Sequence, residues 1–420
     1  MIKSPFVKAG LGAAVAAALV LSAGCSARPD GPPAADAKHS APAKPKRPPA
    51  PPVIERPSMV RHWGSYFGAR KGKNYDIQAA PVALTVPGTV AQVGTSNSTQ
   101  YVLLTNGTMY AWGLGTHGEL GDGGTVNSLN QPVQVRFPVG VKIAFIPTDV
   151  MPYDTALAVD TQGHVWGWGL NGGGELCLGN TASYATPVRL PFSHVTTLAG
   201  ASNHALYDSN GTVYACGQNL EGDLGTGSMA GTITPKKVAG LDGSSVTDLV
   251  ASFANSGALL SNGKYYDWGY NGAGQLGDGQ VGAPSDVPVQ VPLRHPVSQV
   301  ALGGSIWKNG QTIAMLSDGS LWSWGNGWAG QLGDGPRMAQ PVPARFFAPP
   351  GVTYQSLASG SATSYAISTT GKVYAWGVGA LGQVGNGSTL GSQDPVVVAT
   401  HAALISATAN NVLISVPRRK

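Results

Sequence analysis

Residues 268–279 read WGYNGAGQLGDG, and five similar stretches recur along the chain. The six stretches begin at Trp112, Trp168, Cys216, Trp268, Trp324 and Trp376. Successive stretches lie 48 to 56 residues apart, and a period near fifty residues is typical of solenoids, propellers and other repeat arrays. We therefore expect the chain to fold as one array of similar units.

A glycine lies five residues before each of these Trp or Cys residues. These glycines are Gly107, Gly163, Gly211, Gly263, Gly319 and Gly371. Three of them follow an asparagine, and Asn-Gly is a strong hairpin signal because both central residues of the tight turn need a positive φ. Apolar runs flank each turn, and a third strand opens near a proline, as at Pro132 and Pro341. A fourth run leads into the next turn, so each repeat predicts a four-stranded propeller blade.

The two ends of the chain complement each other. Residues 59–64 (MVRHWG) match the last strand and the Trp-Gly pair of a repeat, with Trp63 in the repeat position. Residues 412–415 match the strand that precedes a turn, and the remaining strands of that repeat are missing. We expect the ends to share a seventh blade, which closes the ring and removes free sheet edges. The predicted fold is an all-β, seven-bladed β-propeller over residues 58–420.

The glycine-rich stretches are expected to be structural. A glycine-rich loop that binds phosphate lies between a strand and the start of a helix, and no helical pattern follows here. The glycines are expected to let the backbone turn tightly while the tryptophan packs against a neighbour. Trp166 and Trp322 occupy a strand position that tyrosine fills in sister repeats, so they are expected to pack as well.

The first 57 residues differ in composition from the repeats. Residues 1–24 combine two lysines with an apolar run and small residues, which predicts a secretory signal peptide. The ending LSAGC closely resembles a bacterial lipoprotein signal, in which Cys25 is lipidated; an ordinary cleaved signal and an uncleaved anchor are the alternatives. Residues 25–57 are rich in Pro, Ala and Lys and predict an extended tether. We expect the protein to be exported and held on the membrane of a bacterial cell envelope by this lipid.

The formal net charge of +5 comes from this N-terminal region. Residues 1–57 hold eight Lys or Arg and three acids, which leaves 18 basic and 18 acidic residues for 58–420. Nucleic-acid binding draws most of its affinity from clustered Lys and Arg that neutralise phosphates. We therefore expect no nucleic-acid partner. Lys44, Lys46 and Arg47 of the tether could touch anionic lipid or wall polymer, or could be solvated.

The WGxxxxGxLGxG-like stretches, the hairpin glycines and the split blade give the chain its family resemblance. Over residues 58–420 it resembles the regulator of chromosome condensation repeat family, which implies a seven-bladed propeller. Eukaryotic members exchange guanine nucleotide on a small GTPase and bind chromatin, whereas secreted bacterial members look like protein-binding modules, one kind inhibiting β-lactamases. An exported lipoprotein would meet neither a nuclear GTPase nor chromatin. Both eukaryotic roles are therefore in doubt, and fold alone carries no activity across.

Few residues are arranged for chemistry. Cys177 and Cys216 replace framework residues of the repeat, and they pair as a disulfide only if the fold brings them close enough. The histidines show no metal-ligand spacing, and the LGDG aspartates offer one carboxylate per loop, so we expect no metal and no cofactor. The enzyme alternative is an envelope polysaccharide-acting enzyme that gathers loop carboxylates near the axis. These carboxylates are Glu119, Glu175, Glu221 and Asp223.

Two tryptophans have no packing role in the repeat. Trp328 stands at a variable position of its glycine-rich stretch, and Trp307 precedes a hairpin in SIWKNGQT. Exposed aromatic residues on the loops of a rigid scaffold are candidate binding anchors, although local loop packing would explain them equally well. The sequence thus favours a non-catalytic scaffold that binds an unidentified protein or glycan through its loops.

Overall fold

The computed structural model describes residues 57–71, 74–147, 154–201, 203–241, 243–305 and 309–417, and side chains 66–76 are not among the described parts. The predicted signal peptide, Cys25, the tether and Trp307 lie outside the described residues. The described residues form no helix that is long and apolar enough to cross a bilayer. Their strands form seven antiparallel sheets of four strands each.

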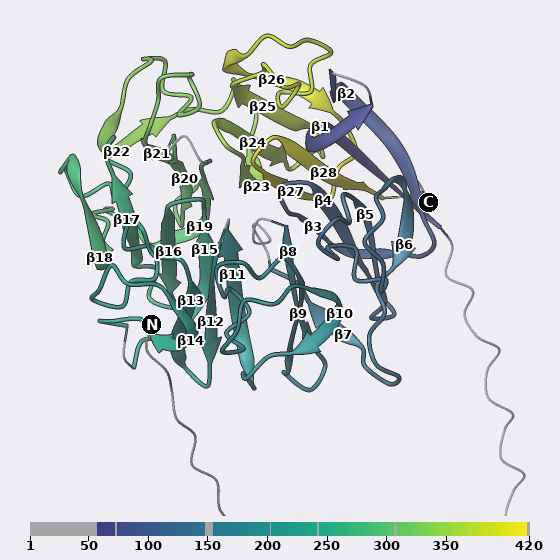
Figure 1. Cartoon of the computed structure of the whole chain (residues 1–420). Coiled ribbons are helices and arrows are strands. Elements are labelled where there is room, and N and C mark those ends of the chain that lie inside the picture. Colours follow the sequence, from purple (N-terminus) through teal and green to yellow (C-terminus); the bar gives the residue numbers. More distant parts are fainter. Residues whose placement is uncertain are drawn as a thin grey trace, which may run out of the picture. The chain divides into compact units, whose positions relative to one another are not determined.

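The seven sheets are the blades of a ring, which Figure 1 shows with its colours following the chain around the circle. We number the blades in chain order. Blade 1 holds β3–β6, blade 2 β7–β10, blade 3 β11–β14, blade 4 β15–β18, blade 5 β19–β22, blade 6 β23–β26, and blade 7 β27, β28, β1 and β2. This arrangement confirms the predicted all-β, seven-bladed propeller.

The strands occupy the same four positions in every blade. The first strands are β3 (Val90–Thr95), β7 (Ile143–Phe145), β11 (Val195–Ala201), β15 (Val246–Ala251), β19 (Val297–Gly303), β23 (Tyr354–Ser359) and β27 (Leu404–Thr408). The second strands are β4 (Thr99–Leu104), β8 (Thr155–Asp160), β12 (His204–Ser209), β16 (Asn255–Leu260), β20 (Gln311–Leu316), β24 (Thr363–Ser368) and β28 (Asn411–Val416). The third strands are β5 (Met109–Gly113), β9 (Val165–Gly169), β13 (Thr212–Gly217), β17 (Tyr265–Asn271), β21 (Leu321–Gly325), β25 (Val373–Gly377) and β1 (Ser58–Lys71). The fourth strands are β6 (Ser128–Gln134), β10 (Tyr184–Arg189), β14 (Thr232–Lys237), β18 (Gly282–Gln290), β22 (Gln340–Phe346), β26 (Ser392–Ala399) and β2 (Asn74–Val86).

The first strands line the axis and the fourth strands form the outer wall. First strands of successive blades contact one another; for example, β11 contacts β15 and β27 contacts β3. Second strands are almost entirely buried, with Met315 and Val416 the half-buried exceptions, whereas fourth strands consist mainly of exposed and half-buried residues. The prolines of the repeat lie on these outer strands, where a missing N–H breaks no internal ladder.

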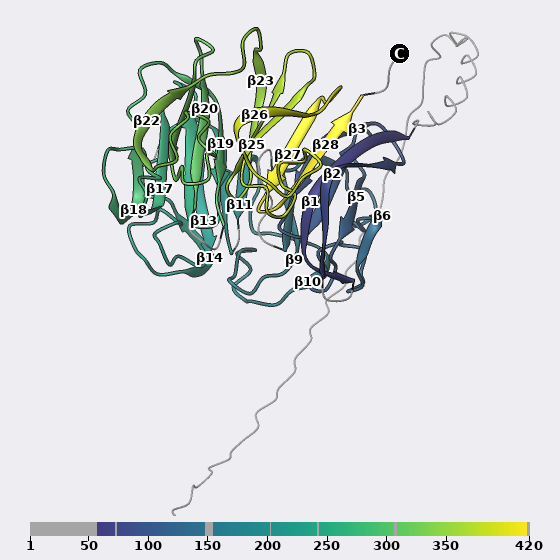
Figure 2. The same cartoon turned by 90° about the horizontal axis from the view of Figure 1, so that it is seen from above.

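The two chain ends share blade 7, as predicted, and each end supplies two strands. β1 pairs with β28 from Met59 opposite Val416 to Gly64 opposite Asn411. In Figures 1 and 2 the purple N-terminal strands lie beside the yellow C-terminal ones. The ring is therefore closed by backbone hydrogen bonds between the two ends of the propeller.

The turn glycines have the expected positive φ, but of the three asparagines before them only Asn210 shares it, at 55°, so the Asn106-Gly107 and Asn262-Gly263 turns are not of the predicted tight type. Gly107 has a φ of 83°, and its N–H donates to the carbonyl of Leu104 at 2.9 Å, which closes the turn between β4 and β5. Trp166 is buried, and its Nε1 donates to Asp160 at 3.0 Å. Trp322 is half-buried against the core, and its Nε1 donates to Ser320. Both tryptophans therefore pack, as their repeat position predicted.

The propeller has two ends with different loops. One end carries the glycine-rich loops that join the third and fourth strands, which we call the WG loops. The loops between first and second strands lie at the same end: the N–H of Leu114, which opens a WG loop, donates to the carbonyl of Ser98. We call this end the WG-loop face. The opposite end carries the blade-to-blade connections and the hairpin turns.

Candidate functional site

The WG loops fasten each blade to the next. In four junctions the indole Nε1 of a repeat tryptophan donates to a backbone carbonyl in the WG loop of the preceding blade at 2.8–2.9 Å. These pairs are Trp168 with Glu119, Trp268 with Asp223, Trp376 with Gln331 and Trp63 with Gln383. The indole also covers a loop glycine that has a positive φ; at Gly225 an added Cβ would lie 2.7 Å from Nε1 of Trp268. The glycine-rich stretches are thus inter-blade clasps, as their structural interpretation predicted.

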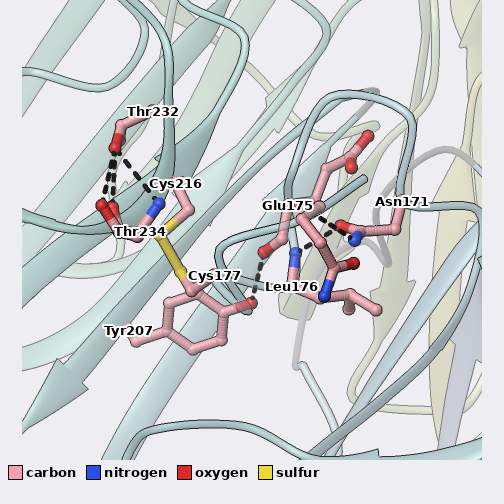
Figure 3. Close-up of a disulfide and its surroundings, with 9 residues drawn as sticks. Asn171, Glu175, Leu176, Cys177, Tyr207, Cys216, Thr232 and Thr234 are labelled. Atoms are coloured by element: carbon pink, nitrogen blue, oxygen red, sulfur yellow. Dashed lines mark hydrogen bonds between the residues drawn. A yellow bond between two sulfur atoms is a disulfide. The ribbon is translucent and has the colours of Figure 1, made fainter. Parts of the chain in front are cut away.

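The junction between blades 2 and 3 uses different chemistry. Cys216 of blade 3 stands where the other blades have tryptophan. Cys177, in the WG loop of blade 2, stands where the other WG loops have glycine, and its φ is 57°. The two sulfurs form a disulfide, and the Cα atoms lie 5.5 Å apart. The disulfide that the sequence left open is therefore present, and it joins the two positions that the Trp-over-Gly contact joins elsewhere (Figure 3).

Tyr207 makes a contact that two other blades also have. Its hydroxyl donates to the carbonyl of Glu175 at 2.8 Å, which is the loop carbonyl that a repeat tryptophan would have reached (Figure 3). Tyr101 and Tyr365 donate in the same way to the carbonyls of Glu119 and Gln383, which also accept the indoles of Trp168 and Trp63. The Tyr207 ring stacks on Phe192 with centroids 4.2 Å apart. The disulfide therefore takes the place of the indole, while the phenol contact is kept.

The loop carboxylates of the enzyme alternative do not converge on one open site. Glu119, Glu175 and Asp223 are buried, and each folds back to accept a backbone N–H two residues earlier in its own loop. Gln275, Gln331 and Gln383 make the same contact in blades 4, 5 and 6 with a neutral amide. A side chain that glutamine replaces without loss of contact acts as a loop cap. Glu221 is half-buried on the same face.

The aspartates of the LGDG sequences stabilise turns. Oδ1 of Asp122 accepts the N–H of Gly124 at 2.9 Å, and Oδ1 of Asp278 accepts that of Gln280 at the same distance. This is the Asx-turn role expected from sequence.

Burial perturbs the carboxyl of Glu175. It raises the pKa to about 7, against the backbone hydrogen bonds that lower it. The group is therefore partly protonated near neutrality, which links the stability of this loop to pH.

Ser256, His204 and Asp223 lie side by side in the core, in an arrangement like that of a hydrolase triad. Nε2 of His204 lies 2.9 Å from Oγ of Ser256, and its Nδ1 lies 3.6 Å from Oδ2 of Asp223. His204 and Ser256 are fully buried, and the Ser256 hydroxyl donates to the carbonyl of Asp223 at 2.8 Å. Ser364 makes the same contact with Gln331 in blade 6. Burial lowers the pKa of His204. The serine is thus a framework residue that no substrate can reach in this conformation.

One group of side chains could hold a cation. His117, Glu119 and Asp154 each offer a ligand atom, and these atoms lie within 4.8 Å of one another. Nδ1 of His117 is 3.1 Å from Glu119, and Ser98 donates to Asp154. Burial raises the pKa of Asp154 to about 6; the hydrogen bond from Ser98 opposes this and Glu119 adds to it. Each member already has a partner, so we assign no metal to the group.

Sequence reasoning missed Asp154 because its loop has no counterpart in the repeat. Nine residues join β7 to β8 and seven join β19 to β20, whereas two or three residues make this connection in the other blades. The longer loops interrupt the repeat at the WG-loop face. The second of them contains Trp307, which lies outside the described residues.

Trp328 is the described anchor candidate, and it is exposed. Its side chain is 64% accessible, and its backbone N–H donates to Asn326 in the same WG loop. Six further large apolar residues are exposed on the WG loops of blades 1, 3, 4, 5 and 6. They are Val126, Leu220, Met229, Val281, Met338 and Leu390. Packing within the loop does not bury Trp328, so this surface is available to a partner.

The fold and the WG-loop clasps define a class of protein: a rigid propeller that presents variable side chains on framework loops. The chain belongs to the regulator of chromosome condensation (RCC1) repeat family. The family model matches residues 106–146, 162–207, 210–257, 262–306 and 318–367, more than half of the chain.

Curated relatives share part of this chain. The human E3 ubiquitin-protein ligase HERC2 is 29% identical over 291 residues, which is 67% of this chain and 6% of the ligase. The ultraviolet-B receptor UVR8 of Arabidopsis thaliana is 28% identical over 296 residues, which is 69% of this chain and 65% of the receptor. The chain thus spans less than two thirds of the length of each of these relatives.

Solved structures share the fold. Human WBSCR16 matches with a TM-score of 0.74 at 18% identity, over 86% of this chain and 100% of that one. Prp20p of Saccharomyces cerevisiae, described with its binding to Gsp1p and histones, matches with a TM-score of 0.73 at 20% identity, over 87% and 93%. Identities this low show the fold alone.

Proposed function

We propose that this protein is a non-catalytic binding scaffold, displayed on a bacterial cell envelope, that recognises a protein or glycan partner through its WG-loop face. The lipidated Cys25 and the tether predicted from sequence would hold the propeller at the membrane. Propellers of the family act on or with other proteins, as the description of Prp20p with Gsp1p and histones illustrates. Gsp1p and histones are partners of Prp20p, and we do not assign them to this chain.

The exposure of Trp328 carries the proposal. A tryptophan that is 64% accessible costs free energy in water and recovers it when a partner covers the ring. Its loop is held by framework contacts: the Trp376 clasp at Gln331 and the cap from Gln331 to Ala329. An aromatic side chain on a rigid loop loses little conformational entropy on binding, which favours a role as an anchor.

The same face gives no support to the polysaccharide enzyme. Glycoside hydrolysis needs two accessible carboxyl groups facing one substrate. Glu119, Glu175 and Asp223 are each buried in a different loop as caps. We therefore propose no second function.

The test is affinity capture from the envelope of the source organism, with the propeller as bait and mass spectrometry as readout. Trp328→Ala is expected to lose the partner at least tenfold, because truncating an anchor ring costs about 2 kcal/mol or more of binding. Trp307→Ala, alone and combined with it, tests the second tryptophan that the sequence singled out.

Phe347→Ala is the matched control. Phe347 is also an exposed aromatic residue, at 67%, but it lies at the opposite end of the propeller after β22. Capture should survive this change. Equal capture by wild type and by the Trp307→Ala/Trp328→Ala double variant would refute the anchor role, and loss of capture with Phe347→Ala would place the binding surface elsewhere.

A further inference from the structure

Basic side chains gather at the end of the propeller opposite the WG loops. Nine exposed Lys and Arg lie on the ends of fourth strands, the blade-to-blade connections and the hairpin turns. They are Arg136, Lys142, Arg189, Lys236, Lys237, Lys264, Arg294, Arg345 and Lys372. We call this end the basic face. Four described carboxylates share it, namely Asp160, Asp208, Asp248 and Asp318, and the first two are buried.

The basic face has an excess of positive charge that the composition conceals. Among the described residues, nine cations against four carboxylates leave an excess of five positive charges at this end, whereas residues 58–420 as a whole are formally neutral. The carboxylate of Asp160 is hydrogen-bonded to His164 and Trp166, and that of Asp208 accepts a hydrogen bond from Thr196. Lys237 apart, these cations make no ion pair with a carboxylate within the described part of the chain. The other eight cations are therefore available to an anionic surface.

Apolar side chains protrude among these cations. Val139 is fully exposed at the tip of a turn in which the N–H of Val141 donates to the carbonyl of Pro138, with Gly140 at a φ of 89°. Phe347 is 67% exposed, and the guanidinium of Arg345 lies 5.1 Å from its ring centroid. A soluble polyanion provides no apolar environment in which these side chains could be buried. The boundary between lipid headgroups and acyl chains accepts both the cations and the apolar tips.

The chain joins the propeller at the same end. β1 begins at Ser58, and Met59 pairs with Val416, the last residue of β28, on the side of the hairpin turns. The first strand of the propeller therefore begins at the basic face. The C-terminal sequence Arg418-Arg419-Lys420 follows two residues after β28 leaves at that face, and its structure lies outside the described residues.

We propose that the basic face is a membrane-docking surface for the anionic phospholipids of a bilayer. Lys and Arg would contact the phosphate groups while Val139 and Phe347 enter the headgroup boundary. The inference rests on the lipid anchorage proposed above, because the anchor brings this end of the propeller to the bilayer. Docking would then turn the WG-loop face, with Trp328, away from the membrane toward partners.

The first experiment measures sedimentation with lipid vesicles. The chain carrying Cys25→Ser, which lacks the lipid, is mixed with vesicles of phosphatidylcholine alone or with 30% phosphatidylglycerol. We expect binding only to the anionic vesicles and weaker binding as salt is raised. The variant Arg136→Gln/Arg189→Gln/Arg345→Gln is expected to bind about 100-fold more weakly, since each charge contributes roughly fivefold.

A charge-matched control separates the face from the net charge. Arg337→Gln, Gln280→Glu and Thr125→Glu together also lower the charge by three, but all three residues lie on WG loops. This variant is expected to bind anionic vesicles within about threefold of the parent. If both triple variants lost vesicle binding equally, the docking face would be refuted, because net charge alone would then explain the binding.

The second experiment asks which end touches the lipid. In the Cys25→Ser chain Cys177 and Cys216 are joined, so Phe347→Cys provides one free thiol for an environment-sensitive fluorophore. Its emission should shift to the blue with anionic vesicles. The same label at Leu220→Cys, on the WG-loop face, should not respond.

Three further results would overturn the proposal: equal binding to neutral vesicles, an equal response of the label at position 220, or binding to DNA or wall polymer with no binding to vesicles. The vesicles contain no protein, so such a failure leaves the Trp328 test of partner binding untouched. Trp328→Ala should bind vesicles like the parent, so loss of capture with vesicle binding intact would show that the two faces act separately.

Discussion

Removing the disulfide between blades 2 and 3 should destabilise the propeller by an amount that the structure allows us to estimate. The bond joins cysteines 39 residues apart. In the chain-entropy account, opening a loop of this length costs about 4 kcal/mol. For a propeller of this size that loss corresponds to a decrease of about 5 °C in Tm. The perturbation is Cys177→Ala/Cys216→Ala, which removes both sulfurs and leaves no free thiol in the core.

The backbone of Cys177 refines this estimate. Its φ of 57° lies in the left-handed region, which costs a residue with a Cβ about 1 kcal/mol relative to glycine. Cys177→Gly/Cys216→Ala should therefore lose about 3 kcal/mol rather than 4. Thermal unfolding, followed by circular dichroism with and without a thiol reductant, measures both variants. The wild type should lose the same stability when reduced, and the variants should not respond to reductant.

Restoring the repeat chemistry tests whether the disulfide replaces the indole. In Cys177→Gly/Cys216→Trp the new indole can share the Glu175 carbonyl with the Tyr207 hydroxyl, as Trp168 and Tyr101 share that of Glu119. This variant should therefore recover at least half of the stability that Cys177→Gly/Cys216→Ala loses. The reasoning is wrong if the disulfide-free variant melts within 1 °C of wild type, or if the new tryptophan recovers no stability.

Two further predictions concern the WG loops. Burial raises the pKa of Glu175 from 4.5 to about 7, so the folded state holds its proton more tightly than the unfolded state, and stability falls as the pH rises between those values. Glu175→Gln should therefore be more stable than wild type above pH 7, by about 3 kcal/mol, and equal to it below pH 4.5; a pH-independent difference in urea unfolding would contradict this. Gly225→Ala, whose Cβ would lie 2.7 Å from Trp268, should cost about 3 kcal/mol. Gly240→Ala, with a similar φ and nothing within 4 Å, should cost only about 1 kcal/mol, and equal costs would show that the clasp is not close-packed.

The fold was predictable because the sequence states it six times. Each repeat carries the same turn glycine, the same Trp or Cys and the same outer-strand proline. A strand or turn whose pattern is ambiguous in one repeat can therefore be assigned from the other repeats. The shared blade followed from two incomplete repeats at the ends. The sequence did not show which carbonyl each indole reaches, since that contact joins different blades and depends on their spacing.

The replacements at Cys177 and Cys216 carried a signal that could have been used. They occur in neighbouring repeats, at the two positions that contact each other as Gly and Trp in five other junctions of the described structure. Without the knowledge that Trp covers that glycine, the two changes look independent. The glutamines of blades 4, 5 and 6 likewise indicated that Glu175 and its sisters act without a charge. Asp154 had no such sister, and Trp307 stays a prediction.

The closure of blade 7 also sets the order in which the chain can mature. β1 and β2 are synthesised early, yet the edge of β1 finds its partner only when β28 has been made. Until then the long-range pairing that completes the ring cannot form, and β1 offers an open edge to proteases or to other chains. A molecule that has lost β27 and β28 would keep this edge open. The split blade thus makes a truncated propeller recognisable by its unpaired strand edge.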